Sequence, residues 1–63
     1  MRKYKAKYEY IRYGKRYTER ITFFSDRYAN SKANYVDAKS EIRRCKGNDI
    51  ADNSMIIFTY IDQ

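Results

Sequence analysis

The chain has 63 residues, fourteen of them Lys or Arg and eight Asp or Glu, and its formal net charge is +6. A domain of this size buries only about 60% of the surface that its unfolded chain exposes, so its stability is marginal without a disulfide, a metal or oligomerisation. Cys45 is the only cysteine and histidine is absent, which excludes an internal disulfide and a structural zinc site. We therefore expect self-association or a bound partner to add stability.

The apolar residues favour a sheet. Eight Tyr and three Phe accompany the isoleucines, and these residue types fit a pleated, half-buried surface. An aromatic content of 17% argues against a disordered chain. No apolar run approaches the roughly 18 residues of a membrane-spanning helix, and we expect neither such a helix nor a signal peptide. A lone free cysteine fits a reducing cytoplasm, which is the location we expect.

Residues 3–10 alternate between polar and apolar side chains and predict a strand, and residues 17–24 predict a second one. Gly14 and Lys15 between them suit the two-residue loop of a type II′ hairpin. On one face of this hairpin apolar residues meet, and on the other face opposite charges meet. The expected register pairs Tyr13 with Arg16, Tyr8 with Ile21, Ala6 with Phe23, Glu9 with Arg20 and Lys7 with Thr22.

A helix is predicted next, with Asn30 or Ser31 as its N-cap and Gly47 at its end. Its apolar face is expected to consist of Tyr35, Ala38, Ile42 and Cys45, extended by Tyr28 if the helix begins near Ser25 or Asp26. Residues 48–54 read as a polar loop and residues 55–61 as a final strand. The expected fold class is α+β: a single domain over residues 1–63, with element order ββαβ, a three-stranded antiparallel sheet in order 2-1-3 and one helix on one face.

The positive charge is concentrated in the hairpin. Residues 1–20 hold eight Lys or Arg and two Glu, whereas the rest of the chain is balanced. A cationic sheet face with an Arg/Tyr tip could lie along a phosphate backbone and stack on a base, although outer-face lysines also serve solubility and protect sheet edges. The predicted residues for binding an anionic partner are Lys3, Lys5, Lys7, Arg12, Tyr13, Lys15, Arg16, Tyr17 and Arg20.

The last strand is apolar at nearly every position, so one helix cannot cover both of its faces. Simple alternation places Ile56, Phe58 and Tyr60 on one face and Met55, Ile57 and Ile61 on the other. Exposed apolar patches usually mark interaction sites. We expect an apolar interface made of Ile11, Phe24, Ile57 and Phe58. Fraying of the strand end and a weak homodimer that covers the patch are the alternatives.

Residues for catalysis or metal binding are sparse. Without His, the commonest general base is missing, and two glycines cannot form a Gly-rich phosphate loop. The carboxylate pairs Asp37/Glu41 and Asp49/Asp52 could hold a hydrated Mg²⁺, but we expect them to be ordinary surface groups. Cys45 has basic neighbours that could activate a thiolate, and we expect instead a small core residue. The chain is predicted not to be an enzyme and to need no cofactor or metal.

In its small size and its richness in Tyr, Ile and Lys, the chain resembles the short early or accessory proteins of large tailed phages and mobile elements. The hairpin followed by a helix opening at Ser31-Lys32-Ala33 also resembles the arm-type DNA-binding domains of phage and transposon integrases, although here a strand follows the helix. The resemblance implies an adaptor or inhibitor that docks on nucleic-acid-handling machinery through the basic hairpin and the apolar face. The alternatives are a direct, largely sequence-nonspecific DNA- or RNA-binding protein and a structural homodimer. No membrane partner is expected.

Overall fold

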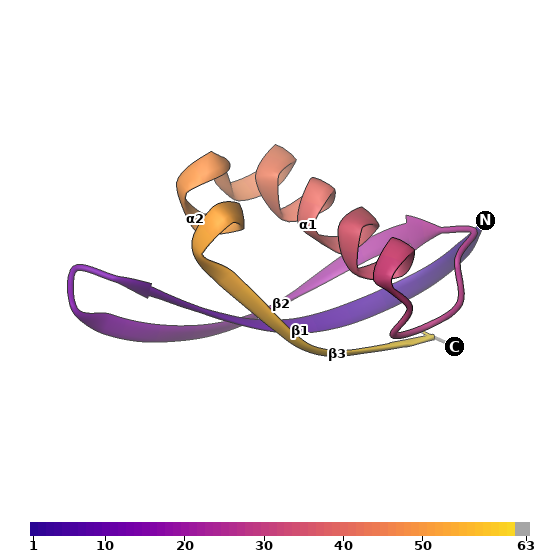
Figure 1. Cartoon of the computed structure of the whole chain (residues 1–63), viewed down its shortest axis with the longest axis horizontal. Helices are drawn as coiled ribbons and strands as arrows, with labels where there is room; N and C mark the ends of the chain where they lie inside the picture. Colours follow the sequence, from indigo (N-terminus) through magenta and orange to yellow (C-terminus); the bar gives the residue numbers. More distant parts are fainter. Residues whose placement is uncertain (62–63) are drawn as a thin grey trace.

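The computed structural model describes residues 1–61, with side chains through residue 57. Five elements follow one another: β1 (Arg2–Arg12), β2 (Lys15–Ser25), α1 (Lys32–Lys46), α2 (Asn48–Asn53) and β3 (Ser54–Ile61). The strands form an antiparallel sheet in the order β2-β1-β3, and both helices lie on one side of it (Figure 1). The expected α+β class and strand order are confirmed, and the structure adds a second helix.

The hairpin turn differs from the expected one. Its loop residues are Tyr13 and Gly14, with φ of 53° and 75°, and Arg12 stands opposite Lys15. Positive φ at both loop positions is the mark of a type I′ turn, whose twist matches that of the flanking strands. The expected type II′ loop at residues 14–15 is therefore wrong.

The pairing register is shifted by two residues from the expected one. The observed pairs include Tyr4 with Phe23, Ala6 with Ile21, Tyr8 with Glu19, Lys7 with Arg20 and Glu9 with Thr18. Because side chains alternate along a strand, a shift of two leaves each of them on its expected face. The observed register brings ring pairs together, since Tyr4 stacks on Phe23 at 5.6 Å and Tyr10 on Tyr17 at 5.2 Å between centroids.

Helix α1 begins and ends where the sequence predicts. The Ser31 side chain accepts a hydrogen bond from the Asn34 backbone N–H at 3.1 Å, and Gly47, with φ of 101°, ends the helix. The buried residues are Asn34, Ala38 and Ile42. Cys45 is exposed because the whole last turn, residues 43–46, lies beyond the packed core, so its expected core role is wrong. Tyr28 does not extend the apolar face either, since it lies before the helix and is exposed.

The polar loop expected over residues 48–54 is instead helix α2 followed by the start of β3. Ile50 and Ala51 are buried in the main core, which gives this short helix a reason to form. Gly47 allows the sharp change of direction between the helices, and an ion pair from Arg43 Nη2 to Asp52 Oδ1, 2.8 Å long, joins them. The sequence signal was only two apolar residues within a polar stretch.

Strand β3 contains an irregularity that breaks the expected alternation. Ile56 stands opposite Tyr8, whereas Phe58 stands opposite Lys7, so Ile57 is an extra residue between them. Ile56 is buried, and its backbone N–H donates to Tyr35 Oη at 3.3 Å. The strict alternation expected along residues 55–61 is therefore interrupted at Ile57, because a β-bulge adds one residue to the strand.

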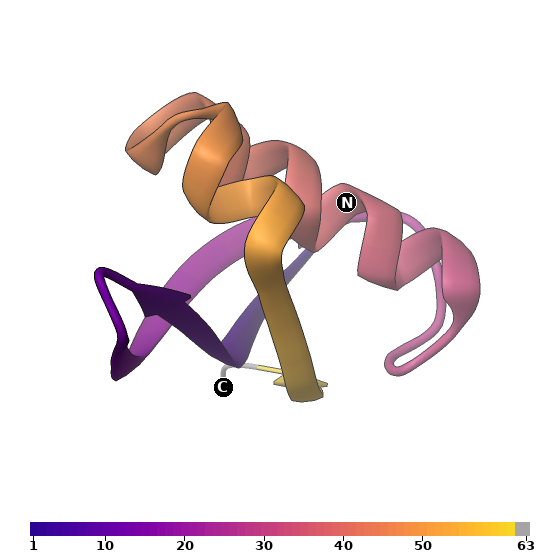
Figure 2. The same cartoon turned by 60° about the vertical axis from the view of Figure 1, so that its left-hand side comes forward.

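The molecule is elongated, with extents of 35 × 17 × 17 Å. The β1–β2 turn lies at one end, next to α2, and the chain's first residue lies at the other (Figures 1 and 2). β1 is the central strand and pairs on both sides. Besides its two paired edges, β1 has two faces: one packs against the helices, and the other points away from them.

Candidate functional site

The two sides of β1 differ in chemistry. Tyr4, Ala6 and Tyr8 are fully buried and share a core with Ala38 and Ile42 of α1. The odd-numbered residues of β1 and their partners point to the opposite side, because side chains alternate. We name this side the open face; its described residues are Lys3, Lys5, Lys7, Glu9, Ile11, Arg16, Thr18, Arg20, Thr22, Phe24 and Met55.

Two cations stand directly opposite each other in the middle of the open face. Lys7 pairs with Arg20 in the β1–β2 register, and Arg20 is exposed. Glu9 is the one carboxylate among the described open-face residues, and its Oε1 accepts a hydrogen bond from Thr18 Oγ1 at 3.4 Å. Within the described part of the chain, Lys7, Arg16 and Arg20 have no ion-pair partner.

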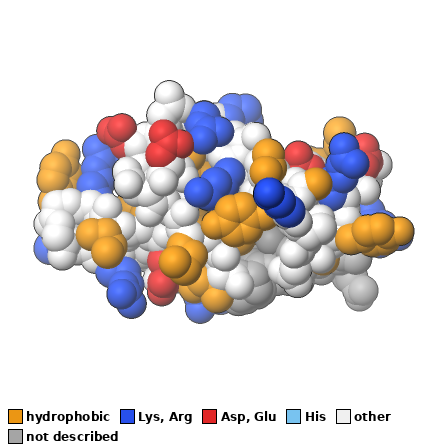
Figure 3. Space-filling view, in the orientation of Figure 1, with side chains coloured by type: hydrophobic (Ala, Val, Ile, Leu, Met, Phe, Trp, Pro, Cys, Tyr) orange, Lys and Arg blue, Asp and Glu red, His pale blue; other side chains and the backbone are white. Residues whose placement is uncertain are grey.

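Three cations of the helical layer, in contrast, form ion pairs. Arg43 pairs with Asp52 at 2.8 Å, Arg44 with Glu41 at 2.6 Å, and Lys46 with Glu19 at 3.5 Å. The Arg44 guanidinium holds the pKa of the Glu41 carboxyl below its ordinary value. Figure 3 shows acidic and basic side chains interspersed over this layer. The net positive charge of the sequence lies within residues 1–20, which form most of the hairpin.

The structure divides the predicted anion-binding residues between two surfaces. Lys3, Lys5, Lys7, Arg16 and Arg20 lie on the open face. Arg12, Lys15 and Tyr17 belong to the other face of the hairpin, and Tyr13 lies in the turn. The Arg12 guanidinium carbon is 5.2 Å from the centroid of the Tyr13 ring, which is a cation–π contact.

A polar network connects the hairpin, at Tyr10 and Glu19, with Lys46 at the end of α1. Tyr10 Oη donates to Glu19 Oε2 at 2.6 Å, and Lys46 Nζ donates to Glu19 Oε1 at 3.5 Å. The hydrogen bond from Tyr10, supported by the Lys46 charge, lowers the pKa of Glu19, and the same hydrogen bond raises the pKa of Tyr10. Burial, with a contribution from the Glu19 charge, raises the pKa of Tyr8 to about 12. These contacts join the hairpin to the end of α1.

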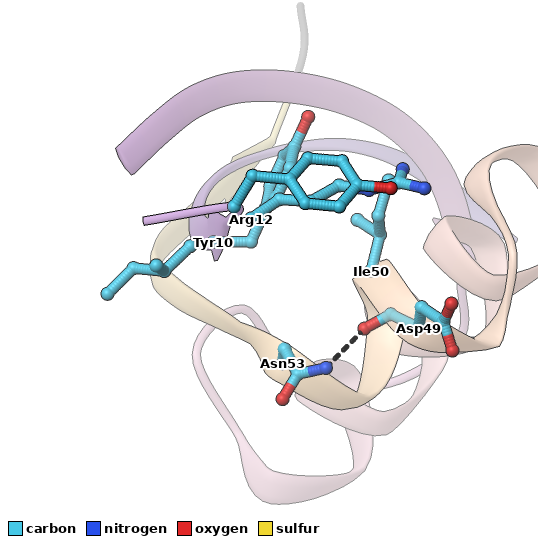
Figure 4. Close-up of a pocket in the computed structure, with 7 residues that line it drawn as sticks. Tyr10, Arg12, Asp49, Ile50 and Asn53 are labelled. Carbon is cyan, nitrogen blue, oxygen red and sulfur yellow. Dashed lines mark hydrogen bonds between the residues drawn. The ribbon is translucent and has the colours of Figure 1, made fainter. Parts of the chain in front are cut away.

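A cleft lies between the end of the hairpin and α2. Its volume is about 270 Å³. Figure 4 shows Tyr10 and Arg12 on the hairpin side and Ile50, Asp49 and Asn53 on the α2 side. We name it the tip cleft; its lining residues are Tyr10, Ile11, Arg12, Tyr13, Asp49, Ile50 and Asn53. The α2 residues were not predicted as site residues, because the sequence did not reveal α2.

A second hollow, with a volume of about 150 Å³, adjoins the tip cleft and shares Tyr10, Ile11 and Asn53 with it. Its other lining residues are Glu9, Arg16 and Met55, all from the open face. The two hollows therefore connect the open face with the α2 side of the hairpin.

Two residues of the predicted apolar interface, Ile11 and Phe24, lie near opposite ends of the open face. Ile11 stands opposite Arg16 near the turn, whereas Phe24 stands opposite Lys3 near the other end. The two pairs are eight positions apart along the strand, which is roughly 27 Å. Ile57 is about half exposed at the bulge, and the Phe58 side chain lies outside the described residues.

Three of the four carboxylates considered for magnesium, those of Asp37, Glu41 and Asp52, have partners within the protein. Asp37 Oδ2 accepts from Ser25 Oγ at 2.5 Å, and Glu41 and Asp52 form the ion pairs given above. Among the described residues, no three His, Cys, Asp or Glu side chains gather in a way that could hold a metal ion. No helix in the described range is long and apolar enough to span a membrane.

Comparison of the chain with protein-family models, with curated protein sequences and with solved structures finds no match.

Proposed function

We propose that this protein is a small non-enzymatic domain that binds nucleic acid directly, through contacts between the open face and the phosphate backbone. The observation that carries the proposal is the pairing of Lys7 with Arg20 in the centre of that face, with no ion pair to either one within the described residues. Like charges directly opposite each other in a sheet destabilise it, so the pair opposes folding. A bound phosphate would relieve that repulsion.

The position of the lysines supports binding over edge protection. Charged residues often protect a sheet because they stand on its edge strands, where they oppose pairing with another chain. Lys7 stands on β1, which is the central strand and is paired on both sides. Edge protection therefore does not account for it, and a surface on which cations outnumber carboxylates attracts a polyanion.

A second candidate is docking on a protein of the nucleic-acid machinery, the leading interpretation from the sequence. The exposed Met55 and Ile11, which line the same hollow, favour it, together with Ile57 nearby in the sequence. The open face would then bring the same cations to an acidic protein surface. An origin in a phage or mobile element remains a prediction.

Salt dependence of binding to nucleic acid tests the proposal. The probe is a fluorescein-labelled 20-nucleotide single strand or its duplex, titrated at about 50 and 200 mM salt. Kd should rise with salt, and the slope of log Kd against log salt should be roughly 0.7 per contacted phosphate for the single strand and roughly 0.9 for the duplex. Replacing Lys7 and Arg20 together by Ala should weaken binding and lower this slope by roughly 1.4 to 1.8, the share of two phosphates.

The matched control removes the same charge from the helical layer. Replacing Arg43 and Arg44 together by Ala also lowers the net charge by two, but these side chains are already paired with Asp52 and Glu41. We expect the control to retain most of the affinity and the salt slope. Equal reductions in both variants would mean that only net charge matters, and affinity independent of salt would contradict phosphate binding altogether.

A further inference from the structure

Tyr13 occupies a backbone conformation that tyrosine rarely adopts. Its φ of 53° places it in the left-handed region, at the first loop position of the type I′ turn. Asn, Asp and Gly are the usual occupants there, and a bulky side chain is an outlier. The ring is 87% exposed, so packing within the fold does not compensate for the unfavourable conformation. Such outliers cluster at binding sites, where the side chain serves a contact with a ligand.

The neighbours of Tyr13 are side chains with flat faces on which an aromatic group can stack. The Arg12 guanidinium lies 5.2 Å from the Tyr13 ring centroid, and both residues line the tip cleft. Tyr10 lines it too, held in place by its stacking on Tyr17 and its hydrogen bond to Glu19. Aromatic rings and guanidinium planes are the groups on which proteins stack unpaired bases.

The α2 side of the tip cleft supplies one apolar side chain and one amide held by a hydrogen bond. Ile50 is buried and presents an apolar surface. Asn53 Nδ2 donates to the Asp49 carbonyl oxygen at 2.8 Å, which fixes the amide and leaves its Oδ1 as an acceptor (Figure 4). A cleft with aromatic, apolar and fixed polar groups fits the face and the edge of a nucleobase, which needs stacking and hydrogen bonds at once.

We propose that the tip cleft holds one unpaired nucleobase of a single strand whose backbone lies along the open face; this inference rests on the proposed function. The volume of about 270 Å³ is sufficient for a single base, and a base within a duplex would have to leave its stack to enter. The adjoining hollow, bordered by Arg16, gives the strand a path from the open face to the cleft. Alternate residues of β1 are roughly 6.8 Å apart, a spacing comparable with that of neighbouring phosphates on an extended strand.

The test uses Tyr13→Asn. Asparagine favours the left-handed conformation of a type I′ turn, so the variant removes the ring while keeping the hairpin, and its melting temperature should be equal to or above that of the parent. Tyr28→Asn is the control, since it also removes an exposed tyrosine but at a position remote from the cleft-lining residues.

Three labelled DNA probes separate base contacts from backbone contacts: a mixed-sequence 12-nucleotide single strand, a strand of the same length made of abasic residues, and a 12-base-pair duplex. Stacking of one base contributes roughly a fivefold or greater gain in affinity. We expect Tyr13→Asn to raise Kd for the normal strand by at least about fivefold and to leave Kd for the abasic strand and the duplex unchanged. Tyr28→Asn should leave all three unchanged.

The outcomes distinguish this inference from the proposed function. Equal affinity of the parent for the normal and the abasic strand, or no effect of Tyr13→Asn on a folded variant, would overturn the base subsite while phosphate binding by Lys7 and Arg20 stands. Failure of all three probes to bind would overturn the proposed function and this inference together.

Discussion

Replacing Arg20 by Glu should make the protein more stable and weaken its binding to nucleic acid at the same time. Lys7 stands directly opposite Arg20, so the substitution changes a like-charge pair into an opposite-charge pair. A substitution that improves the fold and harms binding is the expected behaviour of a residue kept for function at a cost in stability.

The size of the effect follows from the geometry. Opposite charges across neighbouring strands contribute about 0.2 to 1 kcal/mol to the free energy of unfolding, and like charges cost a similar amount. Arg20 is exposed, and solvent screening reduces surface interactions, so the net gain should be about 0.5 to 1 kcal/mol. For a domain of this size that gain corresponds to a rise in melting temperature of about 2 to 8 °C. The rise should shrink at about 1 M salt, where the Debye length is roughly 3 Å.

Thermal unfolding followed by circular dichroism measures the change, with Arg43→Glu as the control. Both variants lower the net charge by two, but Arg43→Glu breaks the ion pair with Asp52 and brings two carboxylates together. We expect its melting temperature to fall slightly, and its affinity for the 20-nucleotide probe to stay above that of Arg20→Glu. A fall in melting temperature for Arg20→Glu would refute the repulsion between Lys7 and Arg20.

Three further predictions concern stability and association. The Glu19 pKa is lowered in the folded protein, so its ionised carboxylate stabilises the fold at pH values above the ordinary pKa of 4.5. Glu19→Gln should therefore lower the free energy of unfolding by about 1 kcal/mol at neutral pH. Melting curves from pH 7 to 3 should show this difference from the parent vanish as the pH falls through the lowered pKa. Asn34 is buried and its side-chain amide has no hydrogen-bond partner within the described residues, so Asn34→Leu should raise the free energy of unfolding by about 1 to 3 kcal/mol in urea titrations. Any dimer formed through the open face should strengthen as salt rises, and Met55→Lys should weaken it without unfolding the chain; sedimentation at about 100 μM protein in low and high salt checks this.

Local patterns in the sequence were sufficient for the overall fold. The alternation around Tyr4, Ala6 and Tyr8 assigns the core side of β1, and Ser31 and Gly47 supply the chemistry that begins and ends α1. These signals are short-range and repeated, so a single sequence reveals them. The strand order also follows, because it is the arrangement in which every neighbouring pair is antiparallel.

Features that depend on contacts distant in sequence could not be predicted. α2 has only Ile50 and Ala51 as buried residues, too few to show a helical period, and it forms because it packs against α1 and β1. The bulge at Ile57 becomes visible only when β3 is paired with β1. The tip cleft combines α2 with the end of the hairpin, so its composition could not be predicted without α2.

The position of the turn decides the electrostatics of the open face. With the loop at residues 14–15, Arg20 would stand opposite Glu9 and the pair would be neutral. With the loop at Tyr13 and Gly14, every side chain keeps its face, but Arg20 stands opposite Lys7 and Glu9 stands opposite Thr18. The stacking of Tyr4 on Phe23 supports the observed register in spite of the repulsion that it creates. The same turn that leaves the central cations without a carboxylate also holds Tyr13 at the border of the tip cleft, so one local conformation accounts for both parts of the proposed site.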